Sequence, residues 1–145
     1  MSTHHAAAIA RVPEARLVAV CDVAEAKARA LAERYGSDIE TDYRRLLGRP
    51  DVDVFEIATP SGAHAEIGIA TAEAGKHVIV AKLIDVTLAK VDHLLVEACR
   101  RNRVKLGATH QFRSYAVYQR LKAAIDRGEP GRLFLGNAFV KWHRS

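Results

Sequence analysis

The sequence has few of the residues that build metal sites and disulfide frameworks. Its 145 residues include only two cysteines, four prolines and 6% aromatic residues. Cys21 and Cys99 are far apart, and neither has a second Cys or His at a metal-ligand spacing, so we expect reduced, buried thiols in a cytoplasmic protein. The adjacent His4 and His5 point about 100° apart on a helix and cannot readily chelate one ion. We therefore expect no metal site.

Long apolar runs are also missing. No run reaches the roughly 20 residues that cross a bilayer, and the N-terminus lacks the apolar core of a secretion signal. We therefore expect no membrane partner and no targeting segment to be removed. The few aromatic residues are too scattered to form a platform for stacked nucleic acid bases.

Positive charge is in moderate excess, with 22 Lys and Arg against 17 Asp and Glu and a net charge of +5. Such an excess could attract a polyanion. The basic residues, however, alternate with acidic ones along the expected helices, which is typical of helix faces in contact with solvent. The sequence therefore favours a protein without a nucleic acid partner.

What the sequence does contain is an alternation of apolar, β-favouring runs with helix patterns. This alternation predicts parallel βαβ units in an α/β protein. Continuous apolar runs such as 17–21 suit strands that are covered on both faces. The expected strands are 16–21, 52–58, 77–81, 104–108 and 132–142, with a short extended piece near Ile39. The expected helices are 24–35, 43–47, 63–74, one that Thr87 caps and that carries apolar residues at 91, 94, 95 and 98, and 114–127.

One part of such a fold is missing. The chain opens on a helix pattern over residues 1–9, with neither a strand nor a glycine-rich turn before it. In a doubly wound sheet that first strand is central, and its turn holds a pyrophosphate at a helix N-terminus. We therefore expect a Rossmann-like doubly wound parallel sheet that is incomplete. The strands beside the gap would keep open edges, so we expect a homo-oligomer or self-association through these edges.

Four segments carry a resemblance to a known family. They are 17–22 (LVAVCD), 51–60 (DVDVFEIATP), 74–78 (AGKHV) and 107–113 (GATHQFR). In this order they resemble the Gfo/Idh/MocA oxidoreductases, which have an N-terminal Rossmann domain that binds NAD or NADP and a C-terminal α/β domain that binds a sugar or cyclitol. The resemblance implies an N-terminally truncated NAD(P)-binding domain over residues 1–127, with Ser2 near the end of the Gly-x-Gly-x-x-Gly turn. Residues 128–145 would form the first strand of a truncated C-terminal domain.

Asp22 is the first candidate for cofactor binding. At the end of its strand, a carboxylate can accept hydrogen bonds from both hydroxyls of the adenosine ribose and would repel a 2′-phosphate. The sequence thus favours NAD over NADP. Asp22-Val23-Ala24-Glu25 also fits a capping box, so a helix cap is the alternative role, and the two roles are compatible.

Thr59, Pro60 and Ser61 follow the next strand at its carboxyl end, the edge where ligands bind in open α/β sheets. The resemblance implies that this loop lines the nicotinamide, with His64 nearby. Alternatively, Ser61 only caps the following helix and His64 is an ordinary residue of its first turn.

Lys82 is the candidate catalytic residue and a further cofactor contact. The family carries Glu-Lys-Pro where this chain has Ala81-Lys82-Leu83, and the resemblance implies that the lysine polarises the reacting hydroxyl or orients the nicotinamide ribose. An ammonium can tune the acidity of a hydroxyl through its charge. Without the Glu and the Pro its position is less constrained. Asp85 is a candidate partner for Lys82, and a solvated loop lysine is the alternative.

Gln111 and Arg113 follow the last strand of the expected Rossmann domain. The resemblance implies a cofactor contact for Gln111 and a substrate contact for Arg113. An arginine can bind a carboxylate or phosphate through two parallel hydrogen bonds. The alternative for Arg113 is a helix-start residue that faces solvent.

The leading hypothesis is an NAD(P)-dependent oxidoreductase that transfers a hydride between nicotinamide and a hydroxyl of a sugar or cyclitol. Because the phosphate-binding turn and the substrate domain are absent from the sequence, we expect weak or undetectable NADH binding and no turnover by this chain alone. The alternative is a non-catalytic remnant, or a nucleotide-binding or interaction module that depends on a partner.

Overall fold

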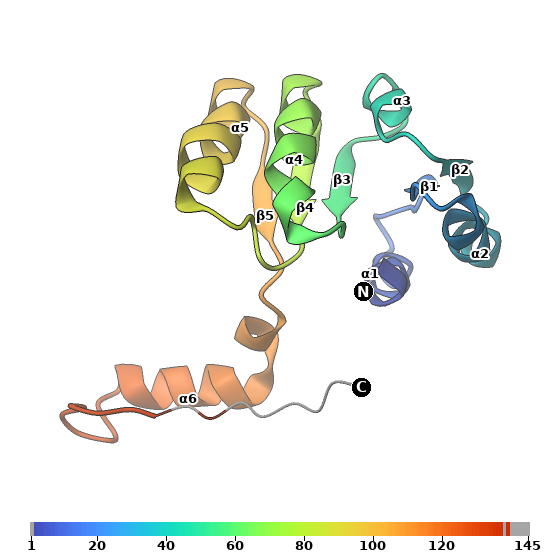
Figure 1. Cartoon of the computed structure of the whole chain (residues 1–145). Helices are drawn as coiled ribbons and strands as arrows, with labels where there is room; N and C mark the ends of the chain where they lie inside the picture. Colours follow the sequence, from blue (N-terminus) through green and yellow to red (C-terminus); the bar gives the residue numbers. More distant parts are fainter. Residues whose placement is uncertain (1, 138, 140–145) are drawn as a thin grey trace. The chain divides into compact units, whose positions relative to one another are not determined.

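A computed structural model describes residues 2–137 and 139 (Figure 1). Contacts between Cα atoms divide the chain into two compact units, one that ends at Thr109 and one that begins at His110. The sequence-based boundary after residue 127 stays a prediction.

The first unit alternates strands with helices, as the sequence predicts. After α1 (Ser2–Ile9), the first helical crossover runs from β1 (Ala19–Cys21) through α2 (Glu25–Tyr35) to β2 (Asp38–Glu40). The remaining elements are α3 (Arg44–Leu47), β3 (Val54–Ile57), η1 (Ser61–Ala63), α4 (His64–Glu73), β4 (His77–Val80), η2 (Lys90–Val96), α5 (Glu97–Arg101) and β5 (Leu106–Ala108). The predicted α/β class is confirmed.

The strands form two separate parallel sheets. In the first, β1 pairs with β2, so that Val20 lies opposite Ile39. In the second, β4 lies between β3 and β5, and Val78 is in register with both Phe55 and Leu106. Within the described part of the chain β1 and β3 are not paired with each other. The sequence predicts open edges on these two strands.

The core lies where α4, η2 and α5 pack on the three-stranded sheet (Figure 1). Leu95 is fully buried there, against Val78, Val80 and small residues of the helices. Gly68 in α4 makes this close packing possible, because a Cβ atom at this position would lie 2.6 Å from Leu95 Cδ1. Leu95 and Ala98, two of the apolar residues in the helix expected after Thr87, are both fully buried.

Glycines in the left-handed conformation follow the ends of α2 and α4. Gly36 has φ 65° and donates its backbone N–H to Ala32 O at the end of α2. Gly75, with φ 74°, follows α4 in the same left-handed conformation. The helix expected after Thr87 starts at Leu88 and continues into the π-helical segment η2, and Thr87 Oγ1 accepts from Lys90 N–H at 3.4 Å. Apolar spacing predicts a helix here but cannot distinguish the two hydrogen-bond registers.

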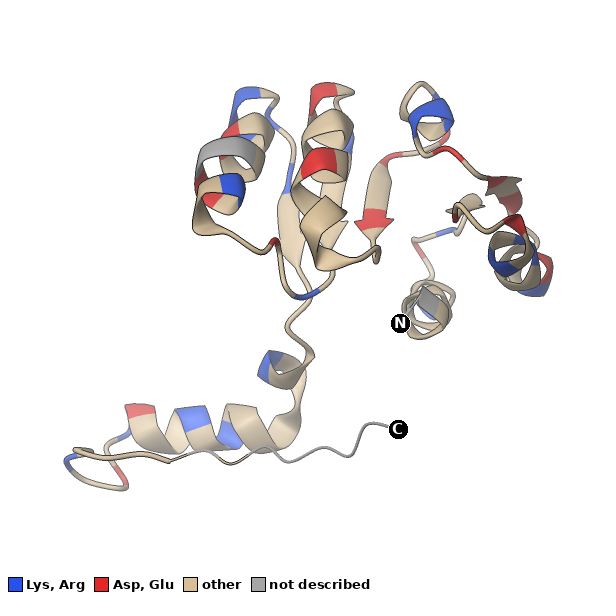
Figure 2. Cartoon of the chain, viewed as in Figure 1, with Lys and Arg blue, Asp and Glu red and all other residues tan. Residues whose placement is uncertain are grey.

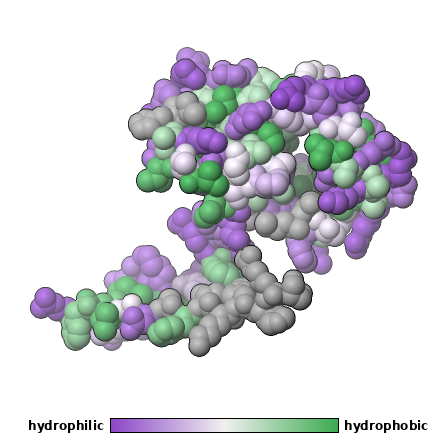
Figure 3. Space-filling view, viewed as in Figure 1, coloured by the Kyte–Doolittle hydropathy of each residue, from purple (hydrophilic) through white to green (hydrophobic). Residues whose placement is uncertain are grey.

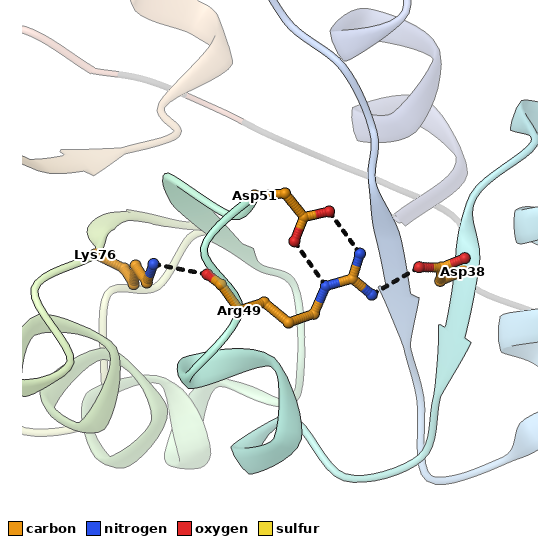
Figure 4. Close-up of polar contacts among 4 residues, drawn as sticks. All are labelled: Asp38, Arg49, Asp51 and Lys76. Atoms are coloured by element: carbon orange, nitrogen blue, oxygen red, sulfur yellow. Dashed lines mark hydrogen bonds and ion pairs between the residues drawn. The ribbon is translucent and has the colours of Figure 1, made fainter.

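Arg49 joins β2 to the segment that enters β3 (Figure 4). Its guanidinium donates two parallel hydrogen bonds to Asp51, at 2.9 and 2.7 Å, and a third to Asp38 at 2.7 Å. Lys76 Nζ donates to the backbone oxygen of Arg49 at 2.8 Å. The hydrogen bonds from Arg49 lower the pKa of the Asp51 carboxyl to about 2.

Acidic and basic residues are interspersed along helices such as α2, as expected (Figure 2). Arg29 pairs with Glu25 on α2 at 2.5 Å, and Lys122 pairs with Asp126 at 2.6 Å on α6 (Ala116–Asp126). Both pairs are four residues apart and exposed, which is the arrangement of a solvated helix surface.

The second unit contains η3 (Gln111–Ser114) and α6. Phe112 packs against Tyr115 and Tyr118 with ring centroids 5.5 and 5.4 Å apart. Apolar side chains are exposed along α6 and over residues 133–135, and Figure 3 shows hydrophobic surface on this unit. Residues 132–137 of the expected strand 132–142 have no regular structure, and residues 138 and 140–142 lie outside the described residues.

Candidate functional site

A hollow of about 430 Å³ opens at the carboxyl end of β1. Asp22 and Cys21 line it from the strand end, Thr3 lines it from α1, and Lys27 and Arg34 line it from α2. Three of these lining residues were not predicted from the sequence: Thr3, Lys27 and Arg34. The spacing of Lys27 and Arg34 could have indicated that both line the same side of the site, because residues seven apart lie on one helix face.

Asp22 holds the turn between β1 and α2. Its Oδ1 accepts from Ala24 N–H at 2.9 Å, while its own N–H donates to Glu40 O at 3.2 Å. The reciprocal bond of a capping box would need that same N–H. Asp22 therefore forms the turn without a complete capping box, and Glu25 pairs with Arg29 instead.

Cys21 lies among carboxylates at the rim of this hollow. Burial raises the pKa of its thiol, and the charges of Glu40, Asp42 and Asp22 raise it further. Cys99 is 3% exposed in the core, and burial raises its pKa as well. Both cysteines are free thiols.

The loop after β3 presents Thr59 and Pro60 on the surface, and Ser61 begins η1. No side chain of this loop caps the helix that follows. The structure thus gives Ser61 no capping bond. His64, the first residue of α4, is only 1% exposed. Its Nε2 lies 2.8 Å from Thr59 O and its Nδ1 lies 2.6 Å from Leu83 O.

Lys82 is exposed in the loop after β4, next to a cis peptide bond between Lys82 and Leu83. The expected pairing of Lys82 with Asp85 is wrong. Asp85 Oδ2 instead accepts from Ala65 N–H at 3.0 Å, Oδ1 accepts from Val86 N–H at 2.6 Å, and its cationic neighbour is Lys90 at 3.9 Å. A fully buried carboxylate needs such donors, and the first turn of α4 supplies one.

The backbone bonds also set the charge of Asp85. Burial alone would raise the pKa of its carboxyl, but the hydrogen bonds from the N–H groups of Ala65 and Val86, together with the charges of Lys90 and His64, lower it. Asp85 is therefore ionised at neutral pH.

Glu56 in β3 is hydrogen-bonded to His5 of α1, with 2.5 Å between Oε1 and Nδ1. Burial raises the pKa of the Glu56 carboxyl, and the bond with His5 opposes part of this rise. Neither residue was predicted to have a partner. The available signal was a charged residue inside an apolar strand run, which usually has a buried partner.

Gln111 and Arg113 lie in η3 of the second unit, and both are exposed. Arg113 donates its backbone N–H to His110 O at 3.0 Å. Their predicted contacts with cofactor and substrate stay predictions.

The structure thus brings together the loops of Thr59 and Lys82 through His64, while Asp22 lines a hollow on the other sheet. Among residues 2–137 and 139, no three His, Cys, Asp or Glu residues gather where they could hold a metal ion. No helix in the same residues is long and apolar enough to cross a membrane.

The fold is that of a Rossmann-like dinucleotide-binding domain. Its parallel strands are joined by helical crossovers, an acidic residue follows β1, and polar loops follow β3 and β4. The pattern of the family described as "Oxidoreductase family, NAD-binding Rossmann fold" matches residues 1–110. The chain belongs to this Gfo/Idh/MocA family, and the resemblance inferred from the sequence is confirmed.

Known proteins support this assignment. The chain is 35% identical over 127 residues to dTDP-3,4-didehydro-2,6-dideoxy-alpha-D-glucose 3-reductase of Saccharopolyspora spinosa, covering 87% of this chain and 38% of that protein. It is 30% identical over 135 residues to myo-inositol 2-dehydrogenase of Thermotoga maritima, covering 91% of this chain and 40% of that protein.

Among solved structures, the WlbA dehydrogenase from Bordetella pertussis in complex with NADH and UDP-GlcNAcA matches with a TM-score of 0.85 and 32% identity. The match covers 90% of this chain and 38% of that one. The chain therefore spans about two fifths of the length of its relatives.

Proposed function

We propose that this chain binds the cofactor in an oxidoreductase that transfers a hydride between nicotinamide and a hydroxyl of a sugar or cyclitol. Membership of the family carries the proposal, because the matching pattern is that of its NAD-binding domain. The substrate class follows the relatives, which include a reductase of a dTDP-sugar and a dehydrogenase of myo-inositol. Bound nicotinamide would accept or donate the hydride, and the protein would orient it.

The hollow beside β1 suits the adenosine end of this cofactor. One oxygen of Asp22 is used by Ala24 N–H, and the carboxylate lines the hollow, where a ribose hydroxyl could donate to it. We propose NAD as the preferred cofactor for this reason. Lys27 and Arg34 on the same rim would favour a 2′-phosphate, so a comparison of NADH with NADPH is the direct test.

The nicotinamide end is proposed to lie at the loops after β3 and β4. Thr59, Pro60 and Ser61 would line the ring, and the exposed Lys82 ammonium would be the catalytic group that polarises the reacting hydroxyl. Gln111 is proposed as a further cofactor contact and Arg113 as the substrate contact. His64, whose ring is buried and bonded at both nitrogens, is proposed to act on the cofactor only through the loops that it joins.

The test is a titration of the isotope-labelled chain with NADH, followed through its backbone amide resonances. This measurement detects the weak binding that we expect and locates it. Shifts should concentrate at Asp22 and the loop of residues 59–61. Shifts that spread over the exposed face of α2, or no shifts at millimolar NADH, would overturn the proposal. We expect no reduction of NAD with inositol or sugars above background for this chain alone.

A second candidate role depends on a partner. Among the described residues, β1 and β3 each pair on one side only, and an unpaired edge can accept another strand. We propose that the chain self-associates through these edges. Size exclusion at two concentrations tests this proposal, since a monomer with β1 and β3 amides fully protected from hydrogen exchange would contradict it.

We also propose that the protein works in the reducing cytoplasm, which its two free thiols support.

A further inference from the structure

His64 has an unusual hydrogen-bond environment for a buried histidine. Both ring nitrogens face backbone carbonyl oxygens, Leu83 O at 2.6 Å from Nδ1 and Thr59 O at 2.8 Å from Nε2. A carbonyl oxygen can only accept, so each of these two bonds needs an N–H group on the ring. A neutral imidazole has one N–H, and its other nitrogen would turn a lone pair toward a carbonyl oxygen.

The surroundings provide negative charge for a cationic ring. Asp85 caps the turn of α4 that His64 begins, and Glu56 lies on the neighbouring strand β3. A charge on His64 lowers the pKa of both carboxyls. The other titratable neighbours are Lys90, 3.9 Å from Asp85, and His5, which is bonded to Glu56.

We propose that His64 is doubly protonated and acts as a positioning residue that ties the loop of Thr59 to the loop of Leu83. The loops lie at the carboxyl ends of β3 and β4, and one ring spans them with one bond to each. Because Leu83 follows Lys82 directly, the bond to Leu83 O fixes the backbone that carries the Lys82 ammonium. The catalytic meaning of this tie rests on the proposed function, whereas the protonation state does not.

Loss of one ring proton has a defined consequence. The neutral ring can keep the bond to Thr59 or the bond to Leu83 but not both, so one loop loses its tie. The two loops therefore respond to the same proton.

His77 provides an internal control. Its Nδ1 lies 3.1 Å from Lys105 N–H and accepts from it, so this nitrogen carries no proton. In a long-range ¹H–¹⁵N spectrum of the full chain at pH 7, His64 should show two protonated ring nitrogens and His77 one. A single protonated nitrogen on His64 at this pH would overturn the proposal.

The positioning role is tested by a pH titration of the amide resonances in the two loops. In the wild-type chain, the amides near Thr59 and Leu83 should shift with the same midpoint as the His64 ring. His64→Gln supplies an amide donor that does not titrate, and it should abolish this common midpoint, whereas His77→Gln should leave it. A common midpoint that persists in His64→Gln would contradict the role.

The wild-type spectrum decides the protonation state even if His64→Gln does not fold. Failure of NADH binding with two protons on His64 would count against the proposed function only. Binding of NADH with one proton on His64 would count against this inference only.

Discussion

Asp85 caps the start of α4, since its Oδ2 accepts from Ala65 N–H, twenty residues earlier in the chain, at 3.0 Å. The residues that precede α4 in sequence provide no side-chain cap. A negative charge at this position also interacts favourably with the helix dipole. The turn after β4 is thus fixed to the start of α4, beside the loop of Thr59.

Asp85→Ala should destabilise the chain, because two backbone N–H groups lose their acceptor in a buried site. We expect about 1–3 kcal/mol from leaving such groups unsatisfied. Chemical denaturation measures this loss as a difference in the free energy of unfolding. Asp92→Ala, at an exposed position in η2, is the matched control and should change stability far less. Equal effects would show that the cap contributes nothing.

The same carboxylate predicts a dependence of stability on pH. The pKa of Asp85 is lowered from the ordinary value of 3.8 in the folded chain. Its contribution is therefore complete above the unfolded pKa and is lost as the pH falls through the lower folded pKa. Asp85→Asn should flatten the stability profile below about pH 4. A profile as steep as that of the wild type would contradict this assignment.

Gly68→Ala should destabilise the first unit although alanine favours helices. The added Cβ would lie 2.6 Å from Leu95 Cδ1, and Leu95 is fully buried and cannot move aside freely. Overpacking of this kind costs about 1–3 kcal/mol. Gly48→Ala, where a Cβ meets nothing within 4 Å, is the control for thermal denaturation. An unchanged melting temperature for Gly68→Ala would mean that the core accommodates the added methyl group, and it would contradict the prediction.

Arg49→Met should raise the pKa of Asp51 from about 2 toward its ordinary value of 3.8, because the hydrogen bonds from the guanidinium lower it. Carboxyl ¹³C shifts followed against pH report this value directly. Arg49→Lys keeps the charge but not the two parallel bonds, so an intermediate value is expected. A pKa of about 2 in both variants would exclude Arg49 as the cause.

Asp22→Asn should shift the preference of the chain from NADH toward NADPH. The amide keeps an oxygen for Ala24 N–H but removes the charge that repels a 2′-phosphate. Asp42→Asn is a close control, since Asp42 Oδ1 accepts from Arg44 N–H at 3.0 Å in the same way. The ratio of the two affinities should change only in Asp22→Asn. An equal change in both variants would reflect net charge alone.

The elements were predictable from the sequence where the pattern is local. The run 52–58 predicts a strand that the structure has at Val54–Ile57, and the spacing of 95 and 98 predicts the side of the helix that packs in the core.

Contacts between distant segments were not predictable in this way. The capping bond of Asp85 and the pairing of His5 with Glu56 join residues 20 and 51 positions apart. Local spacing does not encode such pairs, because the path of the loops decides which donor a buried carboxylate meets. For this reason the sequence predicted Lys82 as the partner of Asp85, whereas in the fold Asp85 caps the start of α4.

The central position of β4 determines which strand of the three-stranded sheet keeps its hydrogen bonds longest. Its amides bond on both sides of the strand: Val78 N–H donates to Lys105 O just before β5, and His77 N–H donates to Asp53 O just before β3, both at 2.9 Å. Strands β1, β2, β3 and β5 each have one partner among residues 2–137 and 139. Fraying from the outer strands inward would thus leave β4 as the last segment whose amide hydrogens exchange with solvent deuterium.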